Sequence, residues 1–371
     1  MSSMQHVAQL AGVSTSTVSR VFQDDPRVAA ETAAAVRQIV RDIGFTPALR
    51  RRRNGTNGKH RQTANAIGFL VLGTSGANAT PGFEKLLRGV SDSANANDLS
   101  LILSFVSDPS DIPQRLLDRR LAGVLCHGDQ PGATGLARLR ALPSVWLMAN
   151  RHRPRWGDQV QPNNAVIGDV AGRYLVRRGH RRLAYHGVGP GGWSMQLRSF
   201  AFGKAAEDAG AEALVFEAPA NHANDYWGDD GLTSAAERLV AQILAAAPMP
   251  TGLFIAEDRV LPAIDRALRA RGIRPGTDVE VVSCNNEQPH YAGLAALPAR
   301  IDIRPEAIGR RGVEQLVWRM RNTDLPERVR VMVDPVLIEP EHNTEYNTEH
   351  VSRNGAGIRS AELNITSSMA D

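Results

Sequence analysis

VAQLAGVS at residues 7–14 and TVSRV at residues 17–21 have the pattern of two short helices joined by a turn. The apolar residues of each stretch recur at the spacing of one helix face. Gly12 can adopt the positive φ of a tight turn, and Ser14 can cap the second helix. A third helical pattern ends at Ile43. Three short helices with a glycine-containing turn between the first two predict a helix-turn-helix domain.

The second of these helices has the features of a helix that reads DNA. Val18 and Val21 fall on one side of it, whereas Thr15, Ser16 and Arg20 fall on the other. Because the DNA major groove admits one α-helix, an exposed helix face can reach the edges of the bases. A bidentate arginine–guanine contact adds about 1–3 kcal/mol of discrimination. The alternative for Arg20 is a phosphate contact or a solvated side chain.

Positive charge is concentrated in the first 61 residues. This segment has ten Lys and Arg against four Asp and Glu, a net charge of +6, so the rest of the chain carries −2 of the total of +4. The asymmetry indicates a polyanionic partner for the amino-terminal part, although a solvated basic segment has the same composition. Residues 49–63 include Arg50–Arg53 and almost no apolar residue. We therefore expect a basic hinge linker there.

From residue 64 onward, apolar runs alternate with helical patterns. Runs suited to buried parallel strands are Ala66–Leu72, Leu99–Val106, Ala122–Cys126, Ser144–Met148, Leu183–His186, Ala213–Phe216, Gly252–Ile255 and Val279–Cys284. Helical patterns are Phe83–Ala96, Val166–Arg178, Gln196–Ala209, Leu232–Ala247 and Arg259–Arg271. This βαβ repetition is too long for one sheet and predicts an α/β core of two doubly wound subdomains. Residues 343–371 lack periodicity, and we expect a disordered tail.

Composition and motifs exclude several classes of protein. Two cysteines, Cys126 and Cys284, are too few for a disulfide framework and fit a reducing compartment. The amino terminus lacks the pattern of a secretory signal, and no stretch approaches the roughly 18 uncharged apolar residues of a membrane span. No Ser/His/Asp set, Cys/His pair or metal-ligand spacing stands out among the ten histidines. We therefore expect a cytoplasmic protein with no metal, no cofactor and no enzymatic activity.

Two other interpretations are open at this level. GVGPGG at residues 187–192 fits the GxGxxG pattern of a dinucleotide-binding fold, with Glu217 at the end of a second strand. Pro190 removes an amide that a phosphate cradle uses, and the next helix begins later, so an NAD(P)-binding enzyme is the weaker interpretation. A cytoplasmic small-molecule-binding protein without a DNA role would share the core but would not need the amino-terminal domain.

The amino-terminal motif resembles the head of the lactose-repressor (LacI/GalR) family of bacterial regulators. Further similarities are GFTP at residues 44–47, Ile67-Gly68 in the first core strand, Gly179-His180 before a later strand, and Asp258 after FIA. The resemblance covers about residues 3–340. It implies a periplasmic-binding-protein-like core behind the helix-turn-helix head.

The resemblance also implies domain boundaries. Residues 1–48 would form the helix-turn-helix domain, residues 49–63 the hinge, and residues 64–342 the effector-binding core. Within the core, residues 64–162 with 293–325 would form one subdomain, and residues 163–292 with 326–342 the other.

In the family, a leucine of the hinge inserts into the minor groove. Its position carries Asn54 here, after Arg50–Arg53. Arginine insertion into a narrow minor groove, or phosphate contact, is a physical substitute, so we expect this hinge to act through charge; Leu49 as a shifted wedge is the weaker alternative. The residues expected to contact DNA are Ser3, Ser14, Thr15, Ser16, Thr17, Arg20, Arg50, Arg51, Arg52 and Arg53.

Ligands of doubly wound sheets bind beyond the carboxyl ends of the strands, here between two subdomains. In the family, the arginine that matches Arg198 contacts the effector, and the aromatic residue that matches Tyr226 stacks on it. The residues expected to bind the effector are Phe83, Asn150, Trp193, Arg198, Tyr226, Trp227, Asp258 and Asn285. Aromatic faces with planar polar groups suit a sugar or a flat heterocycle.

Some of these positions differ from the family or have a second explanation. Asn150, Asn163 and Asn285 stand where the family often has Asp, and an amide donates as well as accepts, so the ligand preference is expected to differ. Asp258 could instead cap the helix that begins at Arg259.

Together these features predict a homodimeric transcription regulator that binds a palindromic operator. We expect this regulator to be a repressor. An effector, expected to be a sugar or related metabolite, would change DNA affinity by rotating one subdomain against the other. Such a protein would be associated with the nucleoid when it is bound to DNA.

Overall fold

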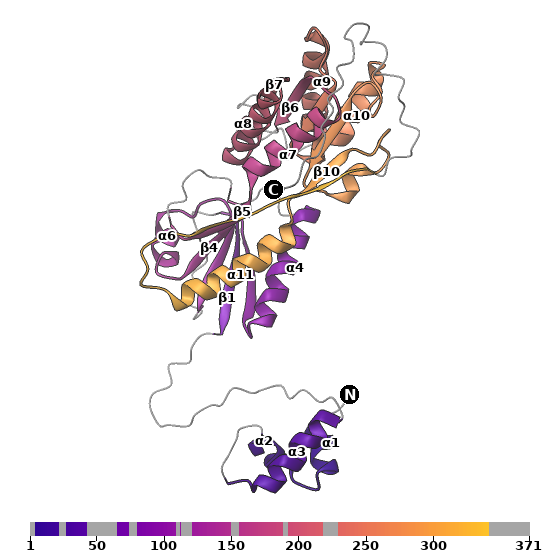
Figure 1. Ribbon diagram of the computed structural model, residues 1–371. Helices are drawn as coiled ribbons and strands as arrows, with labels where there is room; N and C mark the ends of the chain where they lie inside the picture. Colours follow the sequence, from indigo (N-terminus) through magenta and orange to yellow (C-terminus); the bar gives the residue numbers. More distant parts are fainter. Residues whose placement is uncertain are drawn as a thin grey trace, which may run out of the picture. The chain divides into compact units, whose positions relative to one another are not determined.

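A computed structural model describes residues 4–21, 27–42, 65–73, 80–108, 112, 121–149, 156–187, 192–217 and 229–340. The chain divides into two compact units, residues 1–62 and 63–371, which are described separately (Figure 1). Within the described residues, no helix is both long and apolar enough to span a bilayer. The predicted hinge and tail lie outside the described residues.

Among its described residues, the amino-terminal unit contains three helices, α1 (Met4–Leu10), α2 (Thr15–Val21) and α3 (Ala30–Asp42). The turn between α1 and α2 contains Gly12 at φ +64°, the backbone conformation that favours glycine. The helices enclose one small core, made of Val7, Ala8, Val18, Val21 and Val36. The unit therefore has the predicted helix-turn-helix arrangement with a third supporting helix.

In the part of the chain that the structure describes, the first sheet of the second unit has six parallel strands in the order β11-β5-β4-β3-β1-β2. Their bounds are β1 (Ala66–Leu72), β2 (Ser100–Val106), β3 (Gly123–Gly128), β4 (Ser144–Leu147), β5 (Asp158–Pro162) and β11 (Arg330–Val333). Along β1, Phe69 and Val71 pack towards α4 (Pro81–Ala96) and α11 (Pro305–Arg321), whereas Leu70 and Leu72 pack on the opposite face. That opposite core includes Leu139 of α6 (Ala133–Leu139). A strand buried on both faces explains why its sequence is a continuous apolar run.

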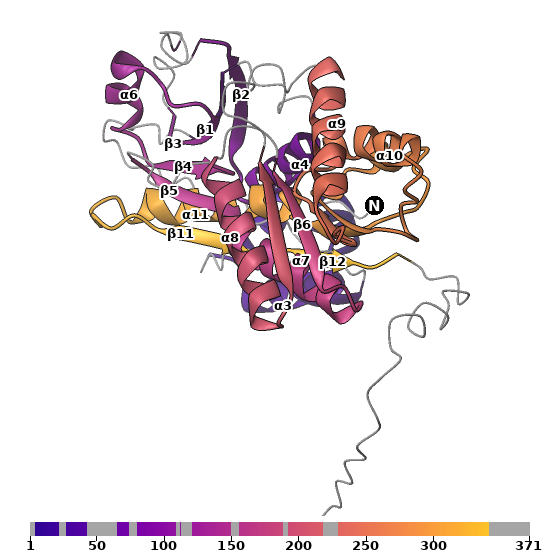
Figure 2. The same ribbon diagram turned by 90° about the horizontal axis from the view of Figure 1, so that it is seen from above.

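The second sheet has the order β12-β10-β9-β8-β6-β7, with only β12 antiparallel among its described strands. Its strands are β6 (Arg182–Gly187), β7 (Glu212–Glu217), β8 (Gly252–Ile255), β9 (Glu280–Cys284), β10 (Ala299–Asp302) and β12 (Val336–Ile338). The helices and 3-10 turns are α7 (Asn164–Arg177), α8 (Trp193–Asp208), α9 (Asp229–Ala245), η4 (Asp258–Val260), α10 (Leu261–Ala270) and η5 (Gln288–Tyr291). The core beside α7 and α8 is separate from the core beside α9 and α10, so helices cover both faces (Figure 2).

The chain passes between the two sheets three times, and this corrects the predicted subdomain boundaries. Residues 293–325 were expected with the first subdomain and 326–342 with the second. Instead, β10 pairs with β9 in the second sheet, and β11 pairs with β5 in the first. Arg304, at φ +57°, lies at the turn that leads from β10 into α11. These short strands lack a long apolar run, so their pairing could not be read from the sequence.

Candidate DNA-binding surface and effector site

The turn before α2 fixes the orientation of the helix that was expected to read DNA. Ser14 Oγ accepts a hydrogen bond from the Thr17 backbone N–H at 3.1 Å and also bonds to Ser16 Oγ at 2.7 Å. This is the predicted cap, and it satisfies one of the free amides at the start of the helix. With Val18 buried in the small core, the opposite side of α2 is presented to solvent.

The exposed side of α2 contains the side chains that were predicted to read bases. Thr15, Ser16 and Arg20 are exposed, and Thr17 is half-buried beside Ser14. The structure thus brings five of the predicted DNA-contacting residues onto one capped helix and its preceding turn. Ser3, Arg50, Arg51, Arg52 and Arg53 lie outside the described residues.

In the core, Phe83 belongs to an aromatic group near the carboxyl edge of the first sheet. Its ring centroid is 6.1 Å from that of Phe105, at the end of β2, and 5.8 Å from that of His127, at the end of β3. Burial lowers the pKa of His127, against the opposing effects of a hydrogen bond to the Leu147 carbonyl and the charge of Asp129. A neutral His127 donates through Nδ1 to that carbonyl and leaves Nε2 as an acceptor.

Arg198, one of the predicted effector residues, is buried and held by two hydrogen bonds. It is 4% exposed, and it donates through Nε to Asn164 Oδ1 at 2.9 Å and through Nη1 to the Ala256 carbonyl at 2.6 Å. Close packing of α7 on α8 supports this position, because a Cβ at Gly168 would overlap the Arg198 carbonyl. The guanidinium group is therefore fixed beside the carboxyl end of β8.

Asp258 makes structural contacts that the sequence did not predict, and its expected contact with the effector stays a prediction. Its Oδ2 accepts from the Tyr291 hydroxyl at 2.6 Å and from the Glu287 backbone N–H at 2.8 Å. Its side chain makes no cap hydrogen bond to η4 or α10. Burial raises its pKa to about 6, although these two hydrogen bonds act in the opposite direction. Asp258 thus holds the loop after β9 in place.

Glu257 was not singled out from the sequence. It follows β8, and its Oε1 lies 3.3 Å from Arg259 Nη2. Burial raises its pKa, while the charges of Arg259 and Arg198 lower it and that of Glu287 raises it. The sequence signal was the placement of two acidic residues directly after a buried strand. Glu257 adds a carboxylate to the edge that carries Arg198.

The other predicted effector residues are only partly described. Asn285, half-buried with φ +112°, follows β9 and donates its backbone N–H to the Ile301 carbonyl at 2.9 Å. Trp193 is half-buried at the start of α8. Asn163 was not among the expected effector residues but stands where the family often has Asp; it caps α7 and donates to Asp334 Oδ1 at 2.7 Å, so its amide is used within the structure. Asn150, Tyr226 and Trp227 lie outside the described residues.

The carboxyl edges of the two sheets meet at the first turn of α4. Gly82 N–H donates to Glu287 Oε1 at 3.1 Å, and Lys85 Nζ donates to the Asn286 carbonyl at 3.3 Å. Phe83, between these two α4 residues, is therefore beside the loop that carries Asn285. The structure brings Phe83, Asp258 and Asn285 towards one region, with Arg198 on the same sheet edge as Asp258.

The structure also describes part of the sequence features that suggested a dinucleotide-binding protein. β6 ends at Gly187, α8 begins at Trp193, and residues 188–191 of the glycine-rich stretch lie outside the described residues. Among the described residues, no cluster of three or more His, Cys, Asp or Glu side chains could hold a metal ion.

Comparison with protein families assigns both units. Residues 3–48 match the model of bacterial regulatory proteins of the lacI family, and residues 173–339 match that of the periplasmic binding protein-like domain. The chain belongs to the LacI family. It is a DNA-binding regulator with an effector-binding core, and this family consists of regulators rather than enzymes. The family match confirms the expected fold class and removes the dinucleotide-binding enzyme as an interpretation.

Curated relatives match this LacI-family protein over nearly their whole length. The ribose operon repressor of Escherichia coli K12 is 26% identical over 350 residues, which cover 91% of this chain and 99% of the relative. The transcriptional repressor PurR of Pectobacterium atrosepticum is 27% identical over 349 residues, covering 91% and 96% respectively.

Solved structures show the same fold at lower identity. A cellobiose complex of the transcriptional regulator CelR superposes with a TM-score of 0.60 at 23% identity, covering 91% of this chain and 98% of that one. The lac repressor dimer bound to operator and an anti-inducer superposes with a TM-score of 0.59 at 17% identity, with the same coverage.

Proposed function

We propose that this protein is a transcriptional repressor that binds a palindromic operator as a homodimer and responds to a small-molecule effector. The observation that carries the proposal is the division of α2 into two sides. Val18 and Val21 are buried, whereas Thr15, Ser16 and Arg20 are exposed on a helix capped by Ser14. A short capped helix with one free polar side has the form of a major-groove reader.

Within this proposal the DNA contacts have different roles. Arg20 would read a base, with Thr15 and Ser16 as adaptable hydrogen-bonding partners. Ser3, Ser14 and Thr17 would contact phosphates or cap the helix, and so set its position. Arg50–Arg53 would supply charge in the hinge. Because Ser14 already bonds within the turn, it would act mainly by orienting α2.

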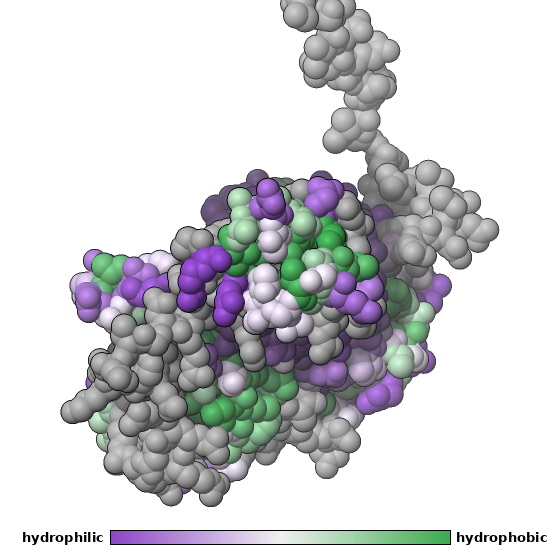
Figure 3. Space-filling model, turned by 90° about the horizontal axis from the view of Figure 1, so that it is seen from below, coloured by the Kyte–Doolittle hydropathy of each residue, from purple (hydrophilic) through white to green (hydrophobic). Residues whose placement is uncertain are grey.

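The homodimer is supported by an exposed edge of the first sheet. β2 is an edge strand, and two of its apolar side chains, Leu103 and Phe105, are 36% and 59% exposed. Figure 3 shows hydrophobic patches among hydrophilic ones on one face of the molecule. A second copy that covers the exposed edge of β2 would bring two heads to one DNA duplex, and a two-fold axis would require a palindromic site.

For the effector we propose a sugar or a related metabolite, with a flat heterocycle as the alternative. The ring face of Phe83, beside His127, can stack on either ligand, and Arg198 can donate to hydroxyl or carbonyl oxygens. A relative named the ribose operon repressor favours the sugar. Repression itself is proposed because the ribose operon repressor and PurR are repressors.

The proposal is tested in two steps on the full-length protein. First, double-stranded sequences that bind the protein are selected from a random pool, and we expect an imperfect palindrome. Second, panels of sugars and of nucleobases are added to the complex, and we expect one panel to change operator affinity. Failure to bind any duplex at low ionic strength would contradict the DNA role, whereas a ligand-insensitive complex would contradict only the effector role.

A further inference from the structure

A contact between α4 and the loop after β9 joins the two halves of the core. α4 packs on the first sheet, whereas residues 285–288 extend from the second. Gly82 N–H donates to Glu287 Oε1 at 3.1 Å, and Lys85 Nζ donates to the Asn286 carbonyl at 3.3 Å. Because both contacts cross from one half of the core to the other, they can form only when the halves are close.

Burial and several hydrogen-bonding partners fix Glu287 in this position. It is 6% exposed, its backbone N–H donates to Asp258 Oδ2 at 2.8 Å, and its Oε2 lies 3.3 Å from His290 Nε2. Its carboxylate also lies at the amino end of α4, a 16-residue helix, where the helix dipole favours negative charge. A buried carboxylate that accepts a backbone N–H in such a place makes a strong hydrogen bond.

The backbone that presents Glu287 is strained. Asn285 and Asn286 have φ of +112° and +57°, which is an uncommon region for residues other than glycine. Asn286 is held by its Nδ2, which donates to Asp302 Oδ2 at 3.0 Å. Consecutive residues in costly conformations persist only where surrounding contacts fix them, and they concentrate at functional sites.

Gly82 is shaped to receive this carboxylate. A Cβ at residue 82 would stand 2.7 Å from Glu287 Oε1, so a larger residue would displace the carboxylate. Phe83 follows directly, and Asp258 holds the Glu287 backbone, so residues of the candidate effector site flank the contact on both sides.

We infer that Glu287 is a positioning residue that latches the two halves of the core together through Gly82. The latch couples the effector site to the separation of the subdomains, and this functional meaning rests on the proposed function. An effector that moves Phe83 or Asp258 would make or break the Gly82–Glu287 bond. The formation or loss of this bond would then affect the paired heads.

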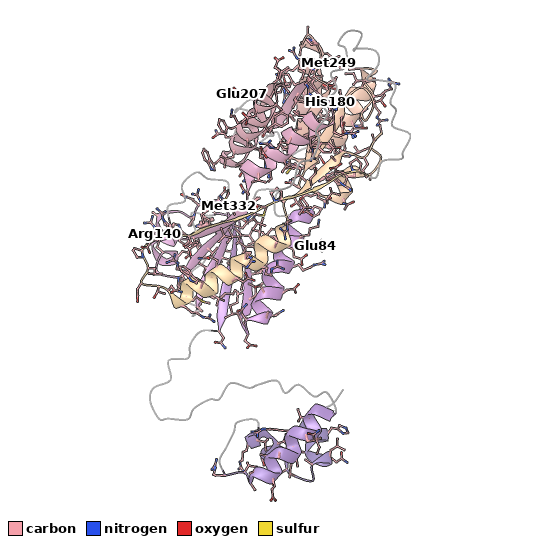
Figure 4. The ribbon with its side chains drawn as sticks, viewed as in Figure 1. Glu84, Arg140, His180, Glu207, Met249 and Met332 are labelled. Atoms are coloured by element: carbon pink, nitrogen blue, oxygen red, sulfur yellow. The ribbon has the colours of Figure 1, made fainter. Side chains whose placement is uncertain are left out.

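The latch can be tested without DNA or effector by measuring the distance between the halves. Nitroxide labels on D92C in α4 and E207C in α8 report this distance by double electron–electron resonance; both sites are exposed, and Glu207 is marked in Figure 4. Cys126 and Cys284 are buried and should remain unlabelled. Dilution with unlabelled protein restricts the signal to distances within one chain.

In the otherwise unchanged protein we expect one main distance that agrees with the structure. E287A and G82A should each shift the distribution to longer distances and lower the ratio of latched to open molecules roughly tenfold or more, as expected for loss of a charged hydrogen bond. E287Q, whose amide oxygen can still accept from Gly82 N–H, should shift it less. The double variant G82A/E287A should shift it no further than either single variant.

Glu84 supplies the matched control, because it lies in the same turn of α4 but is 75% exposed and pairs only with Arg88 among the described residues (Figure 4). E84A should leave the distances unchanged. Identical distributions for E287A and the parent protein, or additive effects of G82A and E287A, would overturn the inference. Either result is independent of whether the protein binds an operator.

Discussion

At the scale of single residues, Arg20 has the most specific expected effect on DNA binding. It is exposed on the last turn of a helix whose other side is buried. We predict that R20A lowers affinity for the selected operator about tenfold or more, because one lost bidentate contact costs about 1–3 kcal/mol. Affinity for random DNA should fall much less. Both are measured by fluorescence anisotropy at one fixed salt concentration.

Arg37 provides the control for charge, since it is exposed on α3 within the same unit. R37A should lower affinity for operator and random DNA to a similar small extent. Equal losses for the two DNAs in R20A would instead identify Arg20 as a phosphate contact.

Side-chain roles that follow from a local sequence pattern were predicted better than roles that depend on contacts with residues distant in the sequence. The two sides of α2 follow from helical spacing, and Ser14 follows from the capping rule. The contact of Glu287 with Gly82 joins residues more than 200 positions apart, and no local pattern connects them. For the same reason the structural contacts of Asp258 were not predicted, because its partners Glu287 and Tyr291 come from another loop.

At the scale of elements, Glu280 ties β9 to the end of α7. Its carboxylate accepts from Tyr174 OH at 2.7 Å and Arg178 Nε at 3.0 Å, and it lies 2.9 Å from His180 Nε2. Burial alone would raise its pKa, but these hydrogen bonds and charges together lower it below the ordinary value of 4.5. Since the folded-state pKa is the lower one, this stabilisation is present above about pH 4.5 and is lost as the pH falls through the folded-state pKa.

We therefore predict that E280Q destabilises the core by about 1–3 kcal/mol at neutral pH. The difference from the parent protein should shrink as the pH falls below 4.5, where the carboxylate itself becomes protonated. Urea unfolding monitored at several pH values measures both effects. E84Q, at an exposed pair, should change stability little at any of these pH values. A loss of stability in E280Q that does not depend on pH would show that the shape of the Glu280 side chain, and not its charge, stabilises the core.

Elements with long apolar runs were predicted well, and short polar ones were not. The predicted strand 66–72 coincides with β1, whereas β5 has the sequence DQVQP and was missed. β5 is nonetheless buried along its length, because Asp158 is neutralised by Arg319 of α11 at 2.7 Å and also accepts from Gln315. A polar strand can be central in a sheet when a distant helix pairs its charge, and hydrophobic periodicity does not detect this.

At the scale of the whole molecule, the division into a head and a two-sheet core follows from composition and repetition along the chain, whereas the predicted linker lies outside the described residues. The exchange of β10 and β11 between the sheets does not. Both strands are short; β10 pairs with β9, the described strand before it, whereas β11 pairs with β5, which is far from it in the sequence. The unit boundaries can therefore be predicted from the local sequence. The passage of the chain between the two sheets depends on contacts between residues that are distant in the sequence.

The charge distribution along the chain leads to a prediction about salt dependence. The net charge of +6 in residues 1–61 is supplied largely by Arg50–Arg53, which precede Asn54 where the family has an inserting leucine. Each phosphate contact that releases counterions adds about 0.9 to the slope of log affinity against log salt. Replacing the four arginines with Gln should therefore lower this slope by roughly 3–4 for each chain bound, provided that each arginine contacts a phosphate.

The matched control removes the same charge from the core, by replacing four exposed arginines, Arg88, Arg173, Arg274 and Arg311, with Gln. This variant has the same net charge as the hinge variant, but its slope should stay close to that of the parent protein. If the hinge acted by a leucine wedge instead, the hinge variant would keep its slope and L49A would lose operator affinity at every salt concentration. A salt titration of the three variants and the parent on one selected operator separates local charge in the hinge from the charge of the molecule as a whole.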